Sequence, residues 1–266
     1  MATFSSKEEI HRQQLKNHFL KRVIIRFDYT SIVDMQNVLN QIVSFLSPPK
    51  QYFRSLNQMQ IGARSLDIKG TQETNKMDYD RPKVYRFSDC VLEPVQNVTL
   101  DFDRNYLCME IHCDSNYTVV DSYLEMMATL INIILGCEGF VQLTRIGIRK
   151  IDGVDAIKPA DADNVFEYFS QQLPWDRKDL MQMRQYTDYM TSPEIEAYVI
   201  YNRIVRVVEN GTNLRFTLDI DCYKDSDFLN PRPEYDLIQK WLIEMNDKLF
   251  NLFKMGIKLD YFNKNI

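Results

Sequence analysis

Two acidic residues, Asp219 and Asp221, are separated by one position in a segment of alternating apolar and polar side chains. In an extended strand, positions i and i+2 face the same side, so these two carboxylates should lie together. Paired carboxylates can hold a divalent cation or act as general acid and base. They also commonly form ion pairs with basic side chains, and Arg215 lies close by on the same strand. The pattern favours ion pairing, and we expect no bound metal.

A second set of candidate residues lies in the segment Thr144-Arg145-Ile146-Gly147-Ile148-Arg149-Lys150-Ile151-Asp152-Gly153. Ile146, Ile148 and Ile151 alternate with polar residues, which is typical of a strand with one face on a core. Arg145 and Arg149 fall on the other face. Gly147 between them leaves space where a ligand or a backbone could approach. Arginine suits the planar oxygens of a carboxylate or phosphate.

The same segment resembles a motif found in a sporadically distributed family of bacterial proteins of similar length. Those proteins carry an Arg-Ile-Gly-Leu-Arg-Tyr-Ile-Asn strand after an amphipathic helix that contains a tyrosine, which is Tyr123 in this sequence. Lys150 and Asp152 replace the Tyr and Asn of the family motif. The resemblance is best over residues 83–152 and weaker from there to Phe253.

The family has no established activity. What the resemblance implies is a stand-alone protein of the bacterial cytosol, an accessory factor in a mobile or defence-type locus. The replacements at positions 150 and 152 leave the strand pattern intact, but a ligand contact shared with the family is not expected there.

Other charged residues fall on outward positions of neighbouring strands. If helices cover only one side of the sheet, the other side gathers the following residues: Arg26, Asp28, Glu110, His112, Arg145, Arg149, Arg203, Arg215, Asp219 and Asp221. We predict that Arg145, Arg149 and Arg215 converge near one anion or one acidic segment of a partner. The competing interpretation is that Glu110, Asp219 and Asp221 neutralise the arginines through cross-strand ion pairs, in which case no ligand is needed.

Common catalytic motifs are absent from the sequence. It contains no GxSxG, HExxH, GxGxxG or phosphate-binding loop. Of its three histidines, His11 and His18 lie near the N-terminus, so a histidine-based site would have to use His112. His112 follows Glu110 on one strand face, where a structural role is more common. The five cysteines form no CxxC pair and their number is odd. We therefore expect free thiols, no disulfide and no cofactor.

Composition limits the class of protein. The chain has 266 residues, of which 45% are hydrophobic and 26% charged, as in soluble globular proteins. A net charge of −5 argues against a nucleic-acid-binding surface over the whole protein. The first twenty residues are polar, and the longest apolar stretch, Met126 to Cys137, is too short to span a bilayer. These features predict a cytoplasmic protein without a membrane segment.

Hydrophobic periodicity predicts an α+β fold, in which long helices pack on one face of a twisted antiparallel sheet. Helical spacing predicts helices over 34–46, 121–135, 162–173 and 234–254. Alternation predicts strands over 21–29, 51–67, 83–88, 97–102, 106–113, 145–151, 197–208 and 214–223. Residues 69–81 are expected to form a loop, and residues 176–192 a polar connection.

The order of elements predicts a polar N-terminal arm, residues 1–20, followed by one α+β domain over 21–266. Strands followed by a long helix occur near 83–135 and again near 197–254, which indicates two related halves, about 21–155 and 156–266, that share one sheet.

The absence of catalytic motifs favours a non-enzymatic binding or assembly protein that holds a protein partner or a second copy of itself. One alternative is a binder or enzyme for a small anionic ligand at Arg145, Arg149 and Arg215. Another is a metal-dependent phosphoryl-transfer enzyme that uses Asp219 and Asp221.

Overall fold

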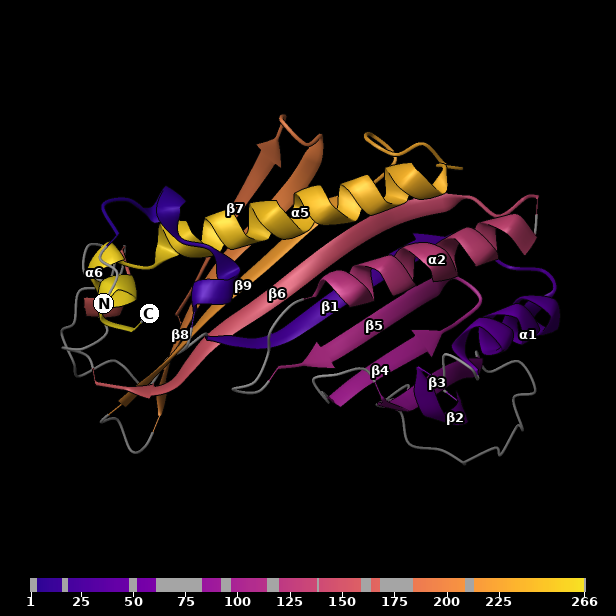
Figure 1. Ribbon diagram of the computed structural model, residues 1–266, viewed down its shortest axis with the longest axis horizontal. Coiled ribbons are helices and arrows are strands. Elements are labelled where there is room, and N and C mark those ends of the chain that lie inside the picture. The colour runs from indigo at the N-terminus through magenta and orange to yellow at the C-terminus, as the bar shows by residue number, and fades with distance from the viewer. Residues whose placement is uncertain are drawn as a thin grey trace, which may run out of the picture.

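The computed structural model describes residues 4–15, 19–47, 52–60, 83–91, 97–113, 120–137, 139–158, 164–167, 184–208 and 213–265. It contains a nine-stranded antiparallel sheet in the order β2-β3-β4-β5-β1-β6-β9-β8-β7 (Figure 1). The strands are β1 (Leu20–Tyr29), β2 (Phe53–Gln60), β3 (Lys83–Cys90), β4 (Asn97–Phe102), β5 (Tyr106–His112), β6 (Leu143–Ile157), β7 (Arg184–Ser192), β8 (Ala197–Val208) and β9 (Asn213–Lys224).

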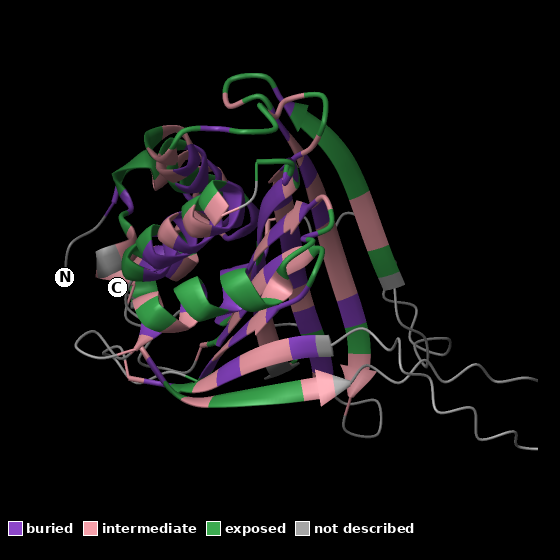
Figure 2. Ribbon diagram, turned by 90° about the vertical axis from the view of Figure 1, so that its right-hand side faces the viewer, coloured by how far each residue is buried: buried purple, intermediate pink, exposed green. Residues whose placement is uncertain are grey.

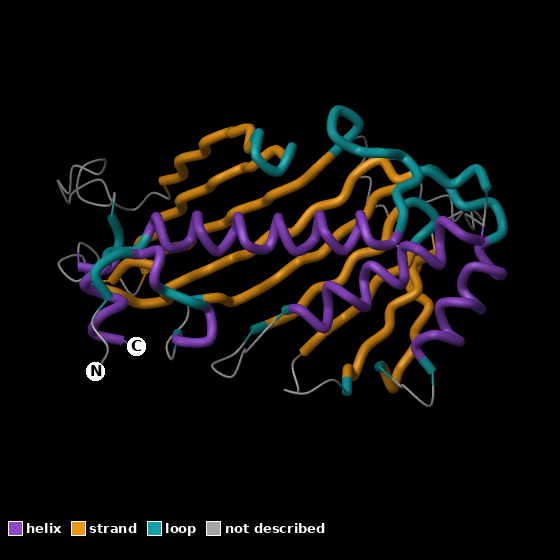
Figure 3. The backbone as a smooth tube through the Cα atoms, turned by 45° about the horizontal axis from the view of Figure 1, so that its top comes forward, coloured by secondary structure: helices purple, strands orange, loops and turns teal. Residues whose placement is uncertain are grey.

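Helices cover one face of this sheet and leave the other face open within the described residues (Figures 1 and 2). They are α1 (Met35–Leu46), α2 (Asp121–Cys137), α5 (Tyr235–Gly256) and the short α6 (Leu259–Asn265). The tube drawing shows the long helix α5 lying along the sheet next to α2 (Figure 3). The predicted α+β class, with long helices on one face of an antiparallel sheet, is therefore confirmed. No described helix is both long and apolar enough to cross a bilayer.

The helices form where their apolar side chains recur at helical spacing. In α5, Leu242, Met245 and Leu249 are fully buried on one stripe. In α1, Asp34 precedes the first turn and accepts a hydrogen bond from the backbone nitrogen of Asn37, at 3.1 Å. This contact satisfies one of the unpaired N–H groups at the start of the helix.

The two central strands, β1 and β6, pair with each other over most of the length of β1. Val23, Ile25 and Phe27 of β1 are fully buried beneath the helices, as are Ile146 and Ile148 of β6. Burying one such side chain stabilises the fold by about 1.5–3 kcal/mol. The predicted register of the 145–151 strand is confirmed at these positions.

Ile151 is an exception to that prediction, because it lies half-buried on the open face with Arg149. Strict alternation instead places Lys150 and Asp152 on the helix-covered face, and both are buried. Two charged residues, at positions 150 and 152, therefore continue the buried face of the strand where Ile151 had been expected.

The strand order is mirrored about the β1–β6 pair. β1 is flanked by β5, and the sheet then continues through β4, β3 and β2, whereas β6 is flanked by β9, followed by β8 and β7. In each group, the strand that comes first in the chain (β1 or β6) lies at the centre of the sheet. The strand that comes last in the chain (β5 or β9) lies directly beside it. By this topology β6 heads the second group, so the two groups divide between α2 and β6, earlier in the chain than residue 155.

Strand β7 was not predicted, since its residues fall in the segment expected to be a polar connection. Arg203 also differs from the prediction: it pairs in register with Leu218, so it lies on the helix-side face. The expected loop 69–81 lies outside the described residues. So does most of the helix expected over 162–173.

The N-terminal arm packs against the C-terminal helices, and the first and last described residues lie close together (Figure 1). Phe4 and Ile10 are buried in the core cluster. The backbone nitrogen of Phe4 donates a hydrogen bond to Asn263 Oδ1 at 2.7 Å. Arg12 Nη2 lies 2.7 Å from Asp247 Oδ1 in α5. The arm is therefore a packed part of the domain despite its polar composition.

Candidate functional site

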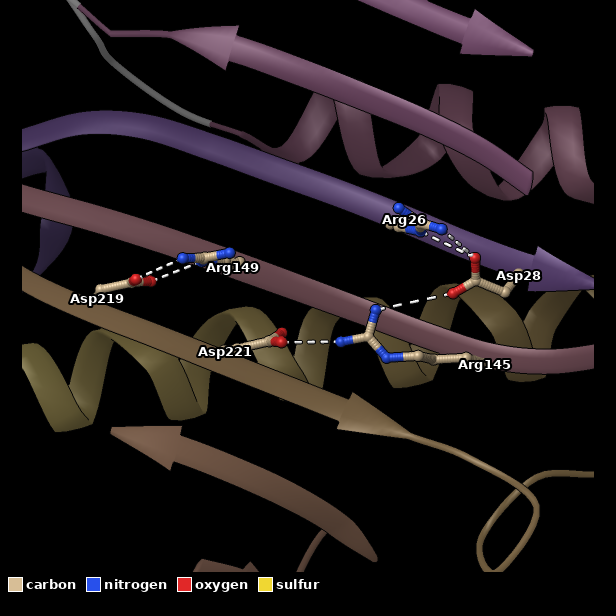
Figure 4. A network of polar contacts seen from close by, with 6 residues as sticks. All are labelled: Arg26, Asp28, Arg145, Arg149, Asp219 and Asp221. Atoms are coloured by element: carbon tan, nitrogen blue, oxygen red, sulfur yellow. Dashed lines mark hydrogen bonds and ion pairs between the residues drawn. The ribbon is translucent and has the colours of Figure 1, made fainter. Parts of the chain in front are cut away.

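The open face of the sheet, called the polar face below, carries a chain of ion pairs across its central strands (Figure 4). Arg145 in β6 lies between two carboxylates. Its Nη2 is 2.8 Å from Asp221 Oδ2 in β9, and its Nη1 is 3.8 Å from Asp28 Oδ2 in β1. Asp28 also accepts from Arg26, at 2.7 Å. Two arginines and two aspartates therefore balance one another.

Arg149 forms a separate pair with Asp219 (Figure 4). Arg149 Nε and Nη2 donate to the two carboxylate oxygens at 2.6 and 2.5 Å, a bidentate geometry. The hydrogen bond that Arg149 donates to Asp219 raises the pKa of Arg149, against the opposing effect of burial. The Asp219 side chain is only 8% exposed, whereas the Arg149 side chain is 45% exposed, so the carboxylate is shielded and the guanidinium remains in contact with water.

The pKa of Asp221 is subject to two opposing effects. Burial raises its pKa, while Arg145 and Arg149 act in the opposite direction. Both aspartates are thus engaged by arginines. In the described part of the chain, no group of three His, Cys, Asp or Glu residues could hold a metal ion.

Gly147 does not leave an open gap. A Cβ atom added there would lie 3.0 Å from Tyr223 Cβ and 3.4 Å from Arg145 Nη2. The guanidinium of Arg145 stacks over the Tyr223 ring, 4.7 Å from its centroid. The glycine therefore makes room for the protein's own side chains, where the sequence predicted room for a ligand.

Arg215 does not join the other arginines. Arg149 is in register with Asp221, and Arg215 lies six positions farther along β9, opposite Arg206 of β8. At roughly 3.4 Å per residue, this places it about 20 Å away. The predicted convergence of Arg145, Arg149 and Arg215 on one anion is therefore wrong. For Arg145 and Arg149 the competing interpretation, mutual neutralisation, describes the structure.

Glu110 and His112 form a third group on the polar face. Glu110 Oε1 lies 2.9 Å from His112 Nε2 and 2.9 Å from Arg22 Nη1 of β1. Glu110 of β5 and Arg149 of β6 both pair with Ile24 of β1, which therefore lies between them. The structure thus separates these two residues from Asp219 and Asp221, and it shows no nucleophile in contact with His112 among the described residues.

Lys150 and Asp152 are buried charged residues that the sequence analysis did not select as a site. Both side chains project from β6 toward the helices, and each residue is less than 10% exposed. Burial lowers the pKa of Lys150, and the positive charge of Arg12 lowers it further. Burial likewise raises the pKa of Asp152, opposed only by Lys150. Perturbed groups of this kind occur both at functional sites and in structural pairs.

A signal for this pair was present in the sequence. Positions 150 and 152 have the same parity as Ile146 and Ile148, so strict alternation placed them in the core. A lysine and an aspartate two residues apart on a core face are rare enough to mark the site.

No protein-family model matches this chain, and no curated protein is detectably similar to it.

Proposed function

We propose that the protein is a non-enzymatic assembly protein that associates with a second copy of itself through the edge strand β7. The observation that carries this proposal is the open outer edge of β7. The polar face supports it indirectly, because Arg145 and Arg149 are paired with the protein's own acids.

β7 has the features of an unprotected sheet edge. It pairs with β8 over all nine residues without a register shift, and no described strand pairs with its other side. Residues 185–191 are all exposed or half-buried (Figure 2). The strand contains no proline or lysine, the residues that commonly block edge pairing. Its one acid, Asp188, is held by Arg203 at 2.7 Å.

The sequence of β7 is compatible with antiparallel pairing to itself about a two-fold axis. An axis at Asp188 would set that carboxylate opposite its own copy, which is unfavourable. An axis at Tyr189 sets the two Tyr189 side chains opposite each other and pairs Thr187 with Thr191. Tyr189 is 78% exposed, so such pairing would bury a large aromatic side chain. We therefore assign the axis to Tyr189.

Cross-strand side-chain pairs contribute about 0.2–1 kcal/mol each. We accordingly expect a reversible dimer whose population rises with protein concentration. The dimer would extend the sheet continuously across both copies, as in other cases of strand addition.

Sedimentation equilibrium of the wild type and two lysine variants tests this proposal. Tyr189→Lys places two cations at the axis and should weaken dimerisation by about tenfold or more, equivalent to ~1.4 kcal/mol. Phe140→Lys is the matched control, because Phe140 is 92% exposed and lies in the connection between α2 and β6. The control should dimerise like the wild type.

A cysteine variant tests the register. Tyr189→Cys should form a disulfide-linked dimer under mild oxidation, since residues directly opposite each other on antiparallel strands have Cβ atoms about 4.5–5.5 Å apart. A wild-type protein that stays monomeric at every concentration would refute the proposal. Equal dimerisation of wild type and Tyr189→Lys would show that the interface lies elsewhere.

A further inference from the structure

Three aromatic side chains, called the aromatic cluster below, gather on the polar face where β8 begins and β9 ends. Tyr198 of β8 is in register with Tyr223 of β9, and their ring centroids lie 5.6 Å apart. The ring centroid of Phe228, in the turn after β9, lies 5.0 Å from that of Tyr198. All three residues are only half-buried, and none of them packs against the described hydrophobic core. Core packing therefore does not explain why these rings lie together.

Two carboxylates border the aromatic cluster. Asp227 Oδ2 accepts a hydrogen bond from the Tyr198 hydroxyl at 2.6 Å, and this bond raises the pKa of Tyr198 to about 12. Asp225 Oδ1 accepts from the backbone nitrogen of Asp227 at 3.2 Å. Burial and the charge of Asp225 both raise the pKa of Tyr223. In the described part of the chain, neither Asp225 nor Asp227 forms an ion pair, so the negative charge beside the rings is not neutralised there.

The polar face already contains one guanidinium held between a ring and a carboxylate. Arg145 stacks over Tyr223, with 4.7 Å between the guanidinium carbon and the ring centroid. The Nη2 atom of the same arginine lies 2.8 Å from Asp221 Oδ2 (Figure 4). A planar cation can therefore contact a tyrosine face and an aspartate together on this sheet. The rest of the aromatic cluster, with its two bordering carboxylates, presents the same combination of groups.

The chemistry of these groups selects the kind of partner. Two carboxylates attract a cation, and the rings offer faces on which a planar cation can stack. In the described part of the chain, no group of three His, Cys, Asp or Glu residues could hold a metal ion. A guanidinium combines a positive charge with a flat surface and a fork of donors that matches carboxylate oxygens. An arginine side chain therefore fits the aromatic cluster better than a lysine does.

We propose that the aromatic cluster and its two carboxylates bind an arginine side chain from a basic segment of a protein partner. The guanidinium donates to Asp225 and Asp227 and stacks on the ring of Phe228. This contact repeats, with an external arginine, the arrangement of Arg145 between Asp221 and Tyr223. It goes beyond self-association through β7, because one copy of the chain supplies every residue of the binding surface.

Titration of the full chain with short blocked peptides, followed by NMR of the aromatic ring protons, tests the proposal. The probe is Gly-Arg-Arg-Gly, and peptides with lysine or citrulline in place of arginine are the comparisons. We expect the arginine peptide to shift the ring signals of Tyr198 and Phe228. The lysine peptide should bind about twofold or more weakly, because an ammonium group cannot stack as a planar guanidinium does. The citrulline peptide keeps the planar shape without the charge and should bind about tenfold or more weakly.

Paired variants locate the binding surface. Asp225→Asn with Asp227→Asn removes both charges, keeps an oxygen acceptor at each position, and should weaken binding of the arginine peptide by about threefold or more. Glu125→Gln with Asp236→Asn is the matched control, because it removes the same charge from exposed positions of α2 and α5 in the helical layer. The control should bind the arginine peptide like the wild type. Phe228→Leu removes only the ring and should weaken binding by about two- to fivefold. Circular dichroism confirms that each variant is folded.

Four outcomes would overturn the proposal. The first is the absence of any shift of these ring signals when the arginine peptide is added to the wild type. The second is equal binding of the arginine peptide and either comparison peptide, since stacking or charge would then play no part. The third is unchanged affinity in the folded Asp225→Asn, Asp227→Asn variant, which would place binding elsewhere. The fourth is an equal loss in the control variant, which would show attraction to the net charge of the protein alone.

Discussion

Lys150 and Asp152 show how strongly a core position can alter the chemistry of a side chain. Burial raises the pKa of Asp152 to about 7 and lowers that of Lys150 to about 8. Taking the two groups out of water disfavours both charged forms, and their mutual attraction offsets only part of this cost. The pair is therefore a source of pH dependence in the stability of the fold.

We predict that the contribution of this pair to the free energy of unfolding is lowest between about pH 7 and pH 8. For Asp152 the folded-state pKa is raised, so its stabilising contribution is present below the unfolded value near 4 and is lost as pH rises through about 7. For Lys150 the folded-state pKa is lowered, so its contribution is present above about 10.4 and is lost as pH falls through about 8. Urea unfolding measured from about pH 4 to about pH 10.4 gives the free energy of unfolding as a function of pH.

The double variant Lys150→Met with Asp152→Asn is the comparison for that profile. It should be as stable as the wild type or more stable near pH 7.5, by up to about 4 kcal/mol, because replacing buried charged groups with uncharged side chains is often stabilising. Its stability should also vary less with pH. A wild-type profile that shows no minimum relative to the double variant would mean that water reaches the pair.

Ile148 provides a second prediction at the scale of one residue. It is fully buried between β1 and β9, beneath the helices, so Ile148→Ala should reduce the free energy of unfolding by about 2–4 kcal/mol through lost burial and a residual cavity. Ile243→Ala is the control, because Ile243 is 54% exposed and should cost well under 1 kcal/mol. Chemical denaturation measures both. A loss below about 0.5 kcal/mol for Ile148→Ala would contradict the observed register.

At the residue scale, alternation predicted which side of the sheet a residue occupies better than it predicted which residues meet. It placed Ile146 and Ile148 in the core and Arg145 and Arg149 on the polar face, as observed. It could not place Arg215, because convergence depends on the pairing register between strands, which side-chain parity does not determine. The register itself sets Arg149 opposite Asp221, and the contact of Arg145 with Asp221 depends on how the arginine side chain extends along the sheet.

At the scale of elements, burial determined what was predictable. The helices α2 and α5 were predicted to begin and end within about two residues of their observed bounds, because each carries an apolar stripe. Strand β7 was missed because neither of its faces is covered along most of its length, so it has no hydrophobic alternation. An edge strand of this kind is defined by its neighbour β8 rather than by its own composition.

The N-terminal arm gives the prediction at this scale. Ile10 is 1% exposed, and its carbonyl accepts a hydrogen bond from Lys254 of α5, at 3.4 Å. Ile10→Ala should destabilise the protein by about 2–4 kcal/mol and increase hydrogen exchange in the arm. His11→Ala, at an exposed neighbouring position, should leave both quantities close to wild type. Equal stability and equal hydrogen exchange of Ile10→Ala and His11→Ala would mean that the arm does not depend on the buried Ile10 side chain.

At the scale of the whole molecule, the two strand groups share one sheet and one core. The β1–β6 pairing joins them, and α2 of the first group packs against α5 of the second. The buried apolar residues form a single cluster that includes Leu100 in β4 and Val199 in β8. Neither group can retain its half of this cluster alone without exposing the central strands.

We therefore predict one cooperative unfolding transition for the whole described fold. Val199→Ala removes two buried methyl groups from the second strand group and should destabilise the protein by roughly 1–3 kcal/mol. If the fold is one unit, native-state hydrogen exchange of the slowest amides in β4 should lose the same free energy as those in β9. Exchange in β4 that is unaffected by this variant would show that the first group unfolds independently. Limited proteolysis near residues 155–195 that released two separately folded pieces would show the same thing by a different method.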